Sequence, residues 1–161
     1  MKINNKDKNI VLIGFMGSGK TSVGKRLSLV LKREFIDTDD FIEKREGMTI
    51  NEIFKEKGEE EFRKIERELY KRFSTPKKKI IATGGGVIKN SANIANLKKG
   101  GVIVYLKSSP EKIAQNLKFD NTRPILQVDD KEAKIRELLA QREPFYNKYA
   151  EITIDVSNYD I

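Results

Sequence analysis

The chain has 161 residues and a formal net charge of +8; 38% of its residues are hydrophobic, 35% are charged, and none is cysteine or histidine. This length and composition predict one soluble globular domain over residues 1–161. The lack of cysteine and histidine excludes disulfides, thiolate or imidazole metal ligands and a cysteine nucleophile, so a general base must be a carboxylate, a lysine or a tyrosine.

Membrane and nucleic-acid partners are not expected. No apolar run approaches the roughly 20 residues that cross a bilayer, and residues 1–8 lack the apolar segment of a signal peptide. The 32 basic residues are interleaved with 24 acidic ones, and the only tight basic run is 77–79. We therefore expect a cytoplasmic protein whose lysine-rich surface surrounds sites for anionic small molecules.

The first predicted element is a strand that leads through a glycine-rich loop into a helix. Residues 9–13 are apolar and β-branched, residues 14–21 match G-x-x-x-x-G-K-[ST], and residues 22–31 have helical apolar spacing. In this context Lys20 would reach the β- and γ-phosphates of a nucleotide and the Thr21 hydroxyl would sit on Mg²⁺. The alternative is a purely structural glycine turn. The predicted phosphate-binding residues are Gly17, Ser18, Gly19, Lys20, Thr21 and Ser22.

Two carboxylates follow the next predicted strand, residues 34–36. Asp37 and Asp39 should lie near the mouth of the P-loop, because parallel strands end at the same edge of a sheet. One could hold Mg²⁺ through water, and the other could accept a proton from an attacking hydroxyl. Capping of the next helix is the alternative for each of them.

Three helices are predicted after these carboxylates. They cover residues 39–45, residues 49–57 and residues 59–73. The second begins with the spacing of a capping box, and the third carries one apolar stripe. That stripe consists of Phe62, Ile65, Leu69 and Phe73.

A run of three glycines, Gly84, Gly85 and Gly86, follows a predicted buried strand over residues 80–82. Many P-loop proteins have an acidic residue at this place. Consecutive glycines indicate positive φ angles or a close approach of the backbone to another group, which at this edge could be a bound substrate. A simple loop hinge is the alternative.

The remaining elements alternate in the same way. We predict a helix over 91–98, a strand over 102–106, a helix starting at Ser109 and Pro110, a loop over 119–129, a helix over 132–149 that Pro144 bends or restarts, and a strand over 152–156. Strands separated by helices imply an α/β fold with a parallel sheet that is covered on both faces.

Three arginines are candidates for binding an anion. Arg63 and Arg142 lie in predicted helices, and each alone would be judged a surface residue. Arg123 lies in the loop over 119–129, the expected place of a lid. There it could close on the transferring phosphate and stabilise the charge of the transition state.

Taken in order and at their spacing, these motifs resemble those of the shikimate kinase family over nearly the full chain. The resemblance rests on Gly14–Thr21, Asp37-Thr38-Asp39, Glu61-Phe62-Arg63, Thr83-Gly84-Gly85-Gly86, Arg123-Pro124, and Arg142 with Tyr146. It implies a P-loop NTPase of the nucleoside monophosphate kinase fold: a three-layer sandwich with a five-stranded parallel sheet in the order 2-3-1-4-5. It also implies one kinase domain over 1–161, with a substrate-binding helical segment at about 38–66 and a lid at about 117–129.

The resemblance further implies transfer of the ATP γ-phosphate to the 3-hydroxyl of shikimate, in aromatic amino-acid (chorismate) biosynthesis, by a monomer that uses Mg²⁺. Asp39 would hold the acceptor hydroxyls and help to activate the nucleophile, Arg63 and Arg142 would grip the carboxylate, and Gly84–Gly86 would contact the acceptor. Lys20 and Arg123 would act on the ATP phosphates, and Thr21 and Asp37 would stand at Mg²⁺.

Two departures concern the adenine side. Relatives often have an arginine before the lid Arg-Pro that packs on adenine, whereas residues 116–119 here are Asn-Leu-Lys-Phe, so this contact passes to Lys118 or is weaker. Relatives also continue past the last strand into an adenine loop and a terminal helix. This chain stops at Ile161, so we expect a minimal adenine pocket or a shortened chain.

Three alternatives stay open. A gluconate kinase of the same fold would also bind a carboxylate and hydroxyls, but the triple glycine and the spacing of Asp37 and Asp39 favour shikimate. A nucleoside monophosphate kinase would need a set of arginines for a second phosphate and a longer lid. A non-catalytic ATP-binding module would be expected to have lost some of Lys20, Thr21, Asp39 and Arg123.

Overall fold

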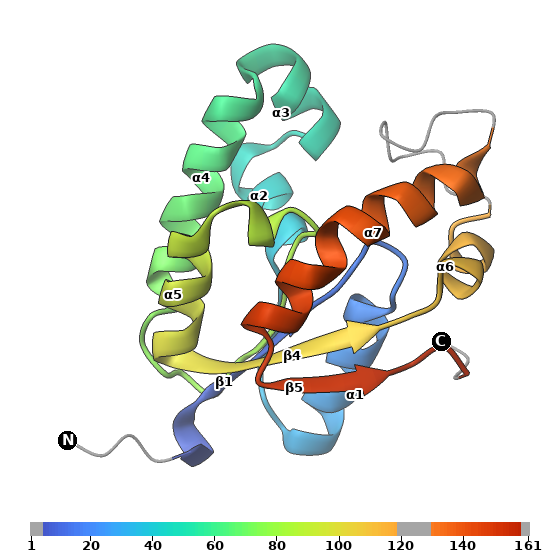
Figure 1. Ribbon diagram of the computed structural model, residues 1–161. Helices are drawn as coiled ribbons and strands as arrows, with labels where there is room; N and C mark the ends of the chain where they lie inside the picture. Colours follow the sequence, from blue (N-terminus) through green and yellow to red (C-terminus); the bar gives the residue numbers. More distant parts are fainter. Residues whose placement is uncertain (1–4, 119–129, 159–161) are drawn as a thin grey trace.

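The computed structural model describes residues 5–118 and 130–158, and its centre is a parallel sheet (Figure 1). The five strands are β1 (Asn9–Ile13), β2 (Phe35–Asp37), β3 (Ile80–Ala82), β4 (Gly101–Lys107) and β5 (Ile152–Asp155). Their order is β2-β3-β1-β4-β5, which confirms the order implied by the resemblance. Leu12 of β1 is in register with Ala82 of β3 and Val104 of β4, so the carboxyl ends of the three central strands share one edge.

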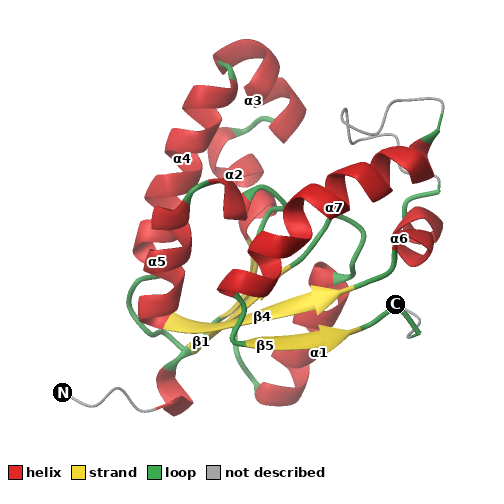
Figure 2. Cartoon of the chain, viewed as in Figure 1, coloured by secondary structure: helices red, strands yellow, loops and turns green. Residues whose placement is uncertain are grey.

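Seven α-helices in the described ranges connect and cover these strands (Figure 2). They are α1 (Lys20–Leu31), α2 (Thr38–Glu46), α3 (Ile50–Lys57), α4 (Glu59–Arg72), α5 (Ser91–Gly100), α6 (Pro110–Asn116) and α7 (Lys131–Tyr149). The predicted helices are therefore confirmed to within a few residues. Two short 3₁₀ turns, η1 (Asn5–Asp7) and η2 (Val87–Lys89), were not predicted. Within the described part of the chain, no helix is long and apolar enough to span a membrane.

Alternate side chains of the strands face opposite sides of the sheet. On one side Val11 packs in a core cluster with Leu69 of α4 and Leu97 of α5. On the other side Leu12 packs with Val23 of α1. Figure 1 shows the same arrangement, with α1 on one side of the sheet and α5 and α7 on the other. The near-continuous apolar strands are thus explained by burial on both faces, and the three-layer prediction is confirmed.

Helices α2, α3 and α4 form a helical lobe beside the sheet. Thr49 and Glu52 make both bonds of the predicted capping box at the start of α3, which satisfies two N–H groups that have no partner within the helix. The rings of Phe54 in α3 and Phe62 in α4 lie 4.9 Å apart. All four residues of the predicted stripe on α4 are buried. This packing fixes the first turns of α4, and with them Arg63, within the helical lobe.

Helix α7 runs without interruption through Pro144 to Tyr149, so the restart that the proline suggested is wrong. Ile135, Leu138 and Leu139 on one side of the proline and Tyr146 on the other are all buried, and this packing outweighs the loss of one backbone hydrogen bond. The loop predicted over 119–129, which contains most of the lid segment and Arg123, lies outside the described residues.

The end of α5 yields a stability prediction. A Cβ atom on Gly100 would lie 2.0 Å from the carbonyl oxygen of Phe73. Gly100→Ala should therefore lower the free energy of unfolding by about 1–3 kcal/mol, although alanine has the better helix propensity by about 1 kcal/mol. Urea denaturation measures the difference. Lys99→Ala, at the exposed neighbouring position, is the control, and equal stability of the two variants would contradict the predicted clash.

Candidate functional site

The P-loop curves between β1 and α1 through glycines with left-handed backbones. Gly17 has a φ of 79° and Gly19 a φ of 94°, angles that residues with a side chain rarely adopt. Gly19 is also the N-cap of α1, so the loop ends at the positive end of a helix dipole. The Lys20 ammonium donates to the carbonyl oxygens of Gly14 at 2.6 Å and Phe15 at 3.0 Å. This combination of loop, helix end and lysine is an anion-binding arrangement.

Asp37 connects the P-loop to the second strand. Its Oδ2 accepts a hydrogen bond from the Thr21 hydroxyl at 2.8 Å, and its Oδ1 accepts one from the Asp40 N–H at 3.1 Å, as the N-cap of α2. The capping role that the sequence offered for Asp37 is confirmed, and the bond from Thr21 places its other oxygen at the P-loop; its role at a metal stays a prediction.

The glycine run lies against charged side chains. A Cβ atom on Gly84 would lie 2.9 Å from Asp39 Oδ1, and one on Gly86 would lie 2.9 Å from the Nη1 atom of Arg63. Neither distance leaves room for a side chain without a shift. The position of a Cβ on Gly85 is 3.5 Å from the Nη1 atom of Arg142. None of the three glycines has a left-handed φ. Of the two reasons that a glycine run suggests, the structure therefore supports close approach.

The two halves of the site are neighbours. The same Cβ position on Gly85 lies 3.8 Å from the backbone nitrogen of Met16 in the P-loop, and the Arg142 guanidinium stands 5.3 Å from the ring centre of Phe15. The predicted phosphate-binding loop and the predicted acceptor-binding residues thus meet at the carboxyl edge of the sheet. Arg123 is the one predicted site residue that lies outside the described ranges.

Glu66 is a site neighbour that the sequence analysis missed. Its side chain is almost fully buried, and its Oε1 accepts a hydrogen bond from Arg63 Nη1 at 3.0 Å. Burial raises the pKa of Glu66 above its ordinary value, against the lowering effect of the nearby Arg63. The available signal was its position on the apolar stripe of α4, four residues after Phe62 and three before Leu69, where a carboxylate needs a buried partner.

Two buried tyrosines hold the glycine run in place, and the sequence analysis assigned them no role there. The Tyr146 hydroxyl donates to the Gly85 carbonyl oxygen at 3.1 Å, and burial raises the pKa of Tyr146 to about 12. Burial also raises the pKa of Tyr70 far above its usual range, while a hydrogen bond with the Gly84 backbone partly offsets this. Both hydroxyls therefore remain protonated, which leaves the lysines and the carboxylates, Asp39 among them, as the candidate bases near the glycine run.

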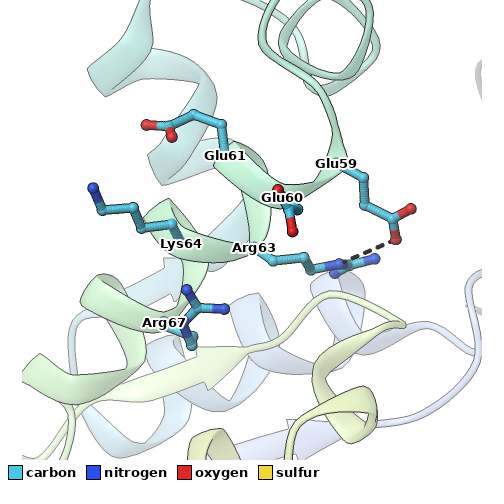
Figure 3. Close-up of a pocket in the computed structure, with 6 residues that line it drawn as sticks. All are labelled: Glu59, Glu60, Glu61, Arg63, Lys64 and Arg67. Carbon is cyan, nitrogen blue, oxygen red and sulfur yellow. Dashed lines mark ion pairs between the residues drawn. The ribbon is translucent and has the colours of Figure 1, made fainter.

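A hollow of about 590 Å³ runs along the outer side of α4 (Figure 3). It is lined by Glu59, Glu60, Glu61, Arg63, Lys64 and Arg67. Only Arg63 belongs both to this hollow and to the predicted site. The predicted site therefore lies at the carboxyl ends of the strands, and the hollow shares only Arg63 with it.

The oxygens of Thr21 and Asp37 fit a magnesium ion that completes its shell with phosphate and water. Mg²⁺ is commonly bound through one or two carboxylates and substrate phosphates, without an all-protein cage. Within residues 5–118 and 130–158 there is no cluster of three or more Asp, Glu, His or Cys that could form such a cage. The Thr21 hydroxyl and the Asp37 carboxylate oxygen, 2.8 Å apart at the P-loop, provide the one or two protein ligands that such a magnesium site needs.

Comparison with known proteins finds a family model described as "Shikimate kinase" that matches residues 16–160. The shikimate kinase of Caldanaerobacter subterraneus subsp. tengcongensis is 53% identical over 154 residues, which cover 96% of this chain and 90% of the relative. The shikimate kinase of Thermodesulfovibrio yellowstonii is 51% identical over 148 residues, covering 92% of this chain and 85% of the relative.

Solved structures extend the comparison to the fold. A shikimate kinase from Acinetobacter baumannii in complex with shikimate matches with a TM-score of 0.86 and 43% identity, covering 91% of this chain and 82% of that chain. A gluconokinase from Sinorhizobium meliloti 1021 matches with a TM-score of 0.53 and 16% identity, covering 96% and 86%. At that identity the gluconokinase shares the fold alone.

The buried Glu66 yields a prediction about pH. Because its pKa is raised in the folded protein, the folded state binds this proton more tightly than the unfolded state. The contribution of Glu66 to stability must then fall as the pH rises from 4.5 through the folded-state pKa. Wild type should lose more stability over this range than Glu66→Gln, which keeps an acceptor for Arg63 but does not ionise. Urea denaturation at several pH values measures this, and parallel pH profiles would contradict it.

Proposed function

The chain belongs to the shikimate kinase family, and we propose that it transfers the γ-phosphate of ATP to the 3-hydroxyl of shikimate, giving shikimate 3-phosphate and ADP. The observation that carries the proposal is the closeness of Asp39, Arg142 and Arg63 to the successive glycines of one backbone segment beside the P-loop, where an added Cβ atom would lie within 3.5 Å of each side chain. That arrangement offers one carboxylate and two arginine forks to a small acceptor that has both hydroxyls and a carboxylate.

The P-loop side binds the donor. The N–H groups of Gly17, Ser18 and Gly19 would surround the phosphates at the positive end of α1, and Lys20 would turn from its loop carbonyls to the β- and γ-phosphates. Thr21 and Asp37 would hold Mg²⁺. When bound, Mg²⁺ neutralises part of the charge on the phosphates. Ser22 would add its hydroxyl or N–H at the first turn of α1.

The acceptor side orients the nucleophile. Arg63 and Arg142 would hold the acceptor's carboxylate. Asp39 would accept hydrogen bonds from its hydroxyls and take the proton from the hydroxyl that attacks. Gly84–Gly86 would form the floor against which the acceptor lies, because a side chain there would fill the space. Phosphoryl transfer depends mainly on such positioning and on charge stabilisation, so a site without histidine is sufficient.

Arg123 completes the proposal as the lid residue on the transferring phosphate, where an arginine stabilises transition-state charge. We further propose that the protein acts as a cytoplasmic monomer in aromatic amino-acid biosynthesis, with ATP and shikimate as its partners. Family membership supports these points.

A coupled assay for ADP release tests the function. With Mg²⁺ and ATP, wild type should release ADP with shikimate, and omission of Mg²⁺ should abolish the signal. Gluconate and nucleoside monophosphates serve as competing acceptors. Turnover of one of these without turnover of shikimate would overturn the proposal, and tight ATP binding without turnover of any acceptor would indicate a non-catalytic ATP-binding module.

Arg142→Ala tests the carboxylate grip. Loss of a charged hydrogen-bonding partner should raise the KM for shikimate about ten- to hundred-fold and leave the KM for ATP nearly unchanged. Arg142→Lys keeps the charge without the planar guanidinium, so its KM for shikimate should lie between those of wild type and Arg142→Ala. Steady-state kinetics with each substrate varied in turn gives both constants. Equal increases in both would contradict the assigned role.

A further inference from the structure

Lys89 lies beside the acceptor side of the site. It ends η2, the turn that follows the glycine run, and its backbone N–H donates to the Gly86 carbonyl at 3.0 Å. Its Nζ stands 3.8 Å from Glu59 Oε1, and the same oxygen stands 3.6 Å from Arg63 Nε. One carboxylate oxygen is therefore shared between Lys89 and the arginine proposed to bind the acceptor.

The two carboxylates around Arg63 differ in how firmly they are held. The Glu66 side chain is 2% exposed and bonded to Arg63 Nη1 at 3.0 Å, so it is a fixed partner. The Glu59 side chain is 60% exposed and lies at ion-pair distance, and Arg63 Nε is a buried nitrogen that makes no hydrogen bond. Figure 3 shows Glu59 and Arg63 facing each other, with Lys64 and Glu61 on the other side of α4. Glu59 is thus the exchangeable partner.

An acceptor carboxylate that binds Arg63 must approach a guanidinium that already has an anion near its Nε. Like charges at such distances repel each other, so Glu59 opposes the binding of an anionic acceptor unless another cation holds it. Lys89 is placed to do so. Partial burial and the charges of Arg63 and Arg142 lower the pKa of Lys89, while Glu59 and Glu66 raise it, so the charge of Lys89 is coupled to both arginines and both carboxylates.

We propose that Lys89 is a specificity-determining residue for an anionic acceptor: it shares the Glu59 carboxylate with Arg63 and thereby weakens the competition of Glu59 with the acceptor's carboxylate for the Nε edge of Arg63. This inference rests on the proposed function, because it assumes an acceptor that carries a carboxylate. Lys89 acts here through Glu59, so it is a positioning residue and does not itself contact the reacting atoms.

Lys89→Met tests the inference, because methionine keeps the apolar stem of lysine and removes the charge. The Kd for shikimate from calorimetry and its KM from the coupled assay should rise about two- to five-fold, the range of an exposed ion pair. The kcat and the KM for ATP should stay at wild-type values. Lys89→Arg should restore shikimate binding, and Lys64→Met, the same charge change on the other side of α4, should leave it unchanged.

The Glu59→Gln background separates an action through Glu59 from a direct attraction of the acceptor. Without the competing carboxylate, Lys89→Met should have little further effect on shikimate binding. If Lys89→Met weakens shikimate binding equally in the wild-type and in the Glu59→Gln background, the proposal is overturned. It is also overturned if Lys89→Met, like Lys64→Met, leaves shikimate binding unchanged. If wild type itself does not phosphorylate shikimate, the proposed function fails. If wild type is active and Lys89→Met matches it, only this inference fails.

Discussion

The acceptor side of the site depends on the closeness of one backbone segment to charged side chains from three different helices. Asp39 comes from α2, Arg63 from α4 and Arg142 from α7, and each lies against a different glycine of the run. Because β3 is central in the sheet, the glycine run that follows it lies between these helices. The helices can converge there only because no side chain separates them from the backbone. The buried hydroxyls of Tyr146 and Tyr70 then bond the backbone of Gly85 and Gly84.

Much of this arrangement could be predicted from local sequence signals. The P-loop, the capping box at Thr49 and Glu52, and the N-cap at Ser109 each require particular residue types at fixed spacing, so they are visible without any tertiary structure. The α/β class followed from the alternation of apolar strands with helices. The strand order did not follow from these signals, since alternation fixes neighbours in sequence and not neighbours in the sheet; it came from the family resemblance.

The missed features are those that depend on partners far apart in the sequence. Tyr146 meets Gly85, and Lys89 meets Glu59, only after the helices have packed. Glu66 looked like one more charge on a highly charged helix. The continuous course of α7 through Pro144 has the same origin, because buried side chains on both sides of the proline override a local preference. Asp37 is a different case: the capping role that its local sequence indicated is confirmed, and its second oxygen bonds Thr21 in the P-loop only because tertiary structure brings the two together.

The three glycines also differ in how they can be varied. The outer two leave no space for a methyl group before a carboxylate or a guanidinium must move, whereas at Gly85 a methyl group would make an ordinary contact with Arg142. Each outer position is therefore linked to a different charged group, Gly84 to the Asp39 carboxylate and Gly86 to the Arg63 guanidinium. An engineer who wished to admit an altered acceptor could begin at Gly85, where a small side chain would narrow the floor of the site and displace neither Asp39 nor Arg63.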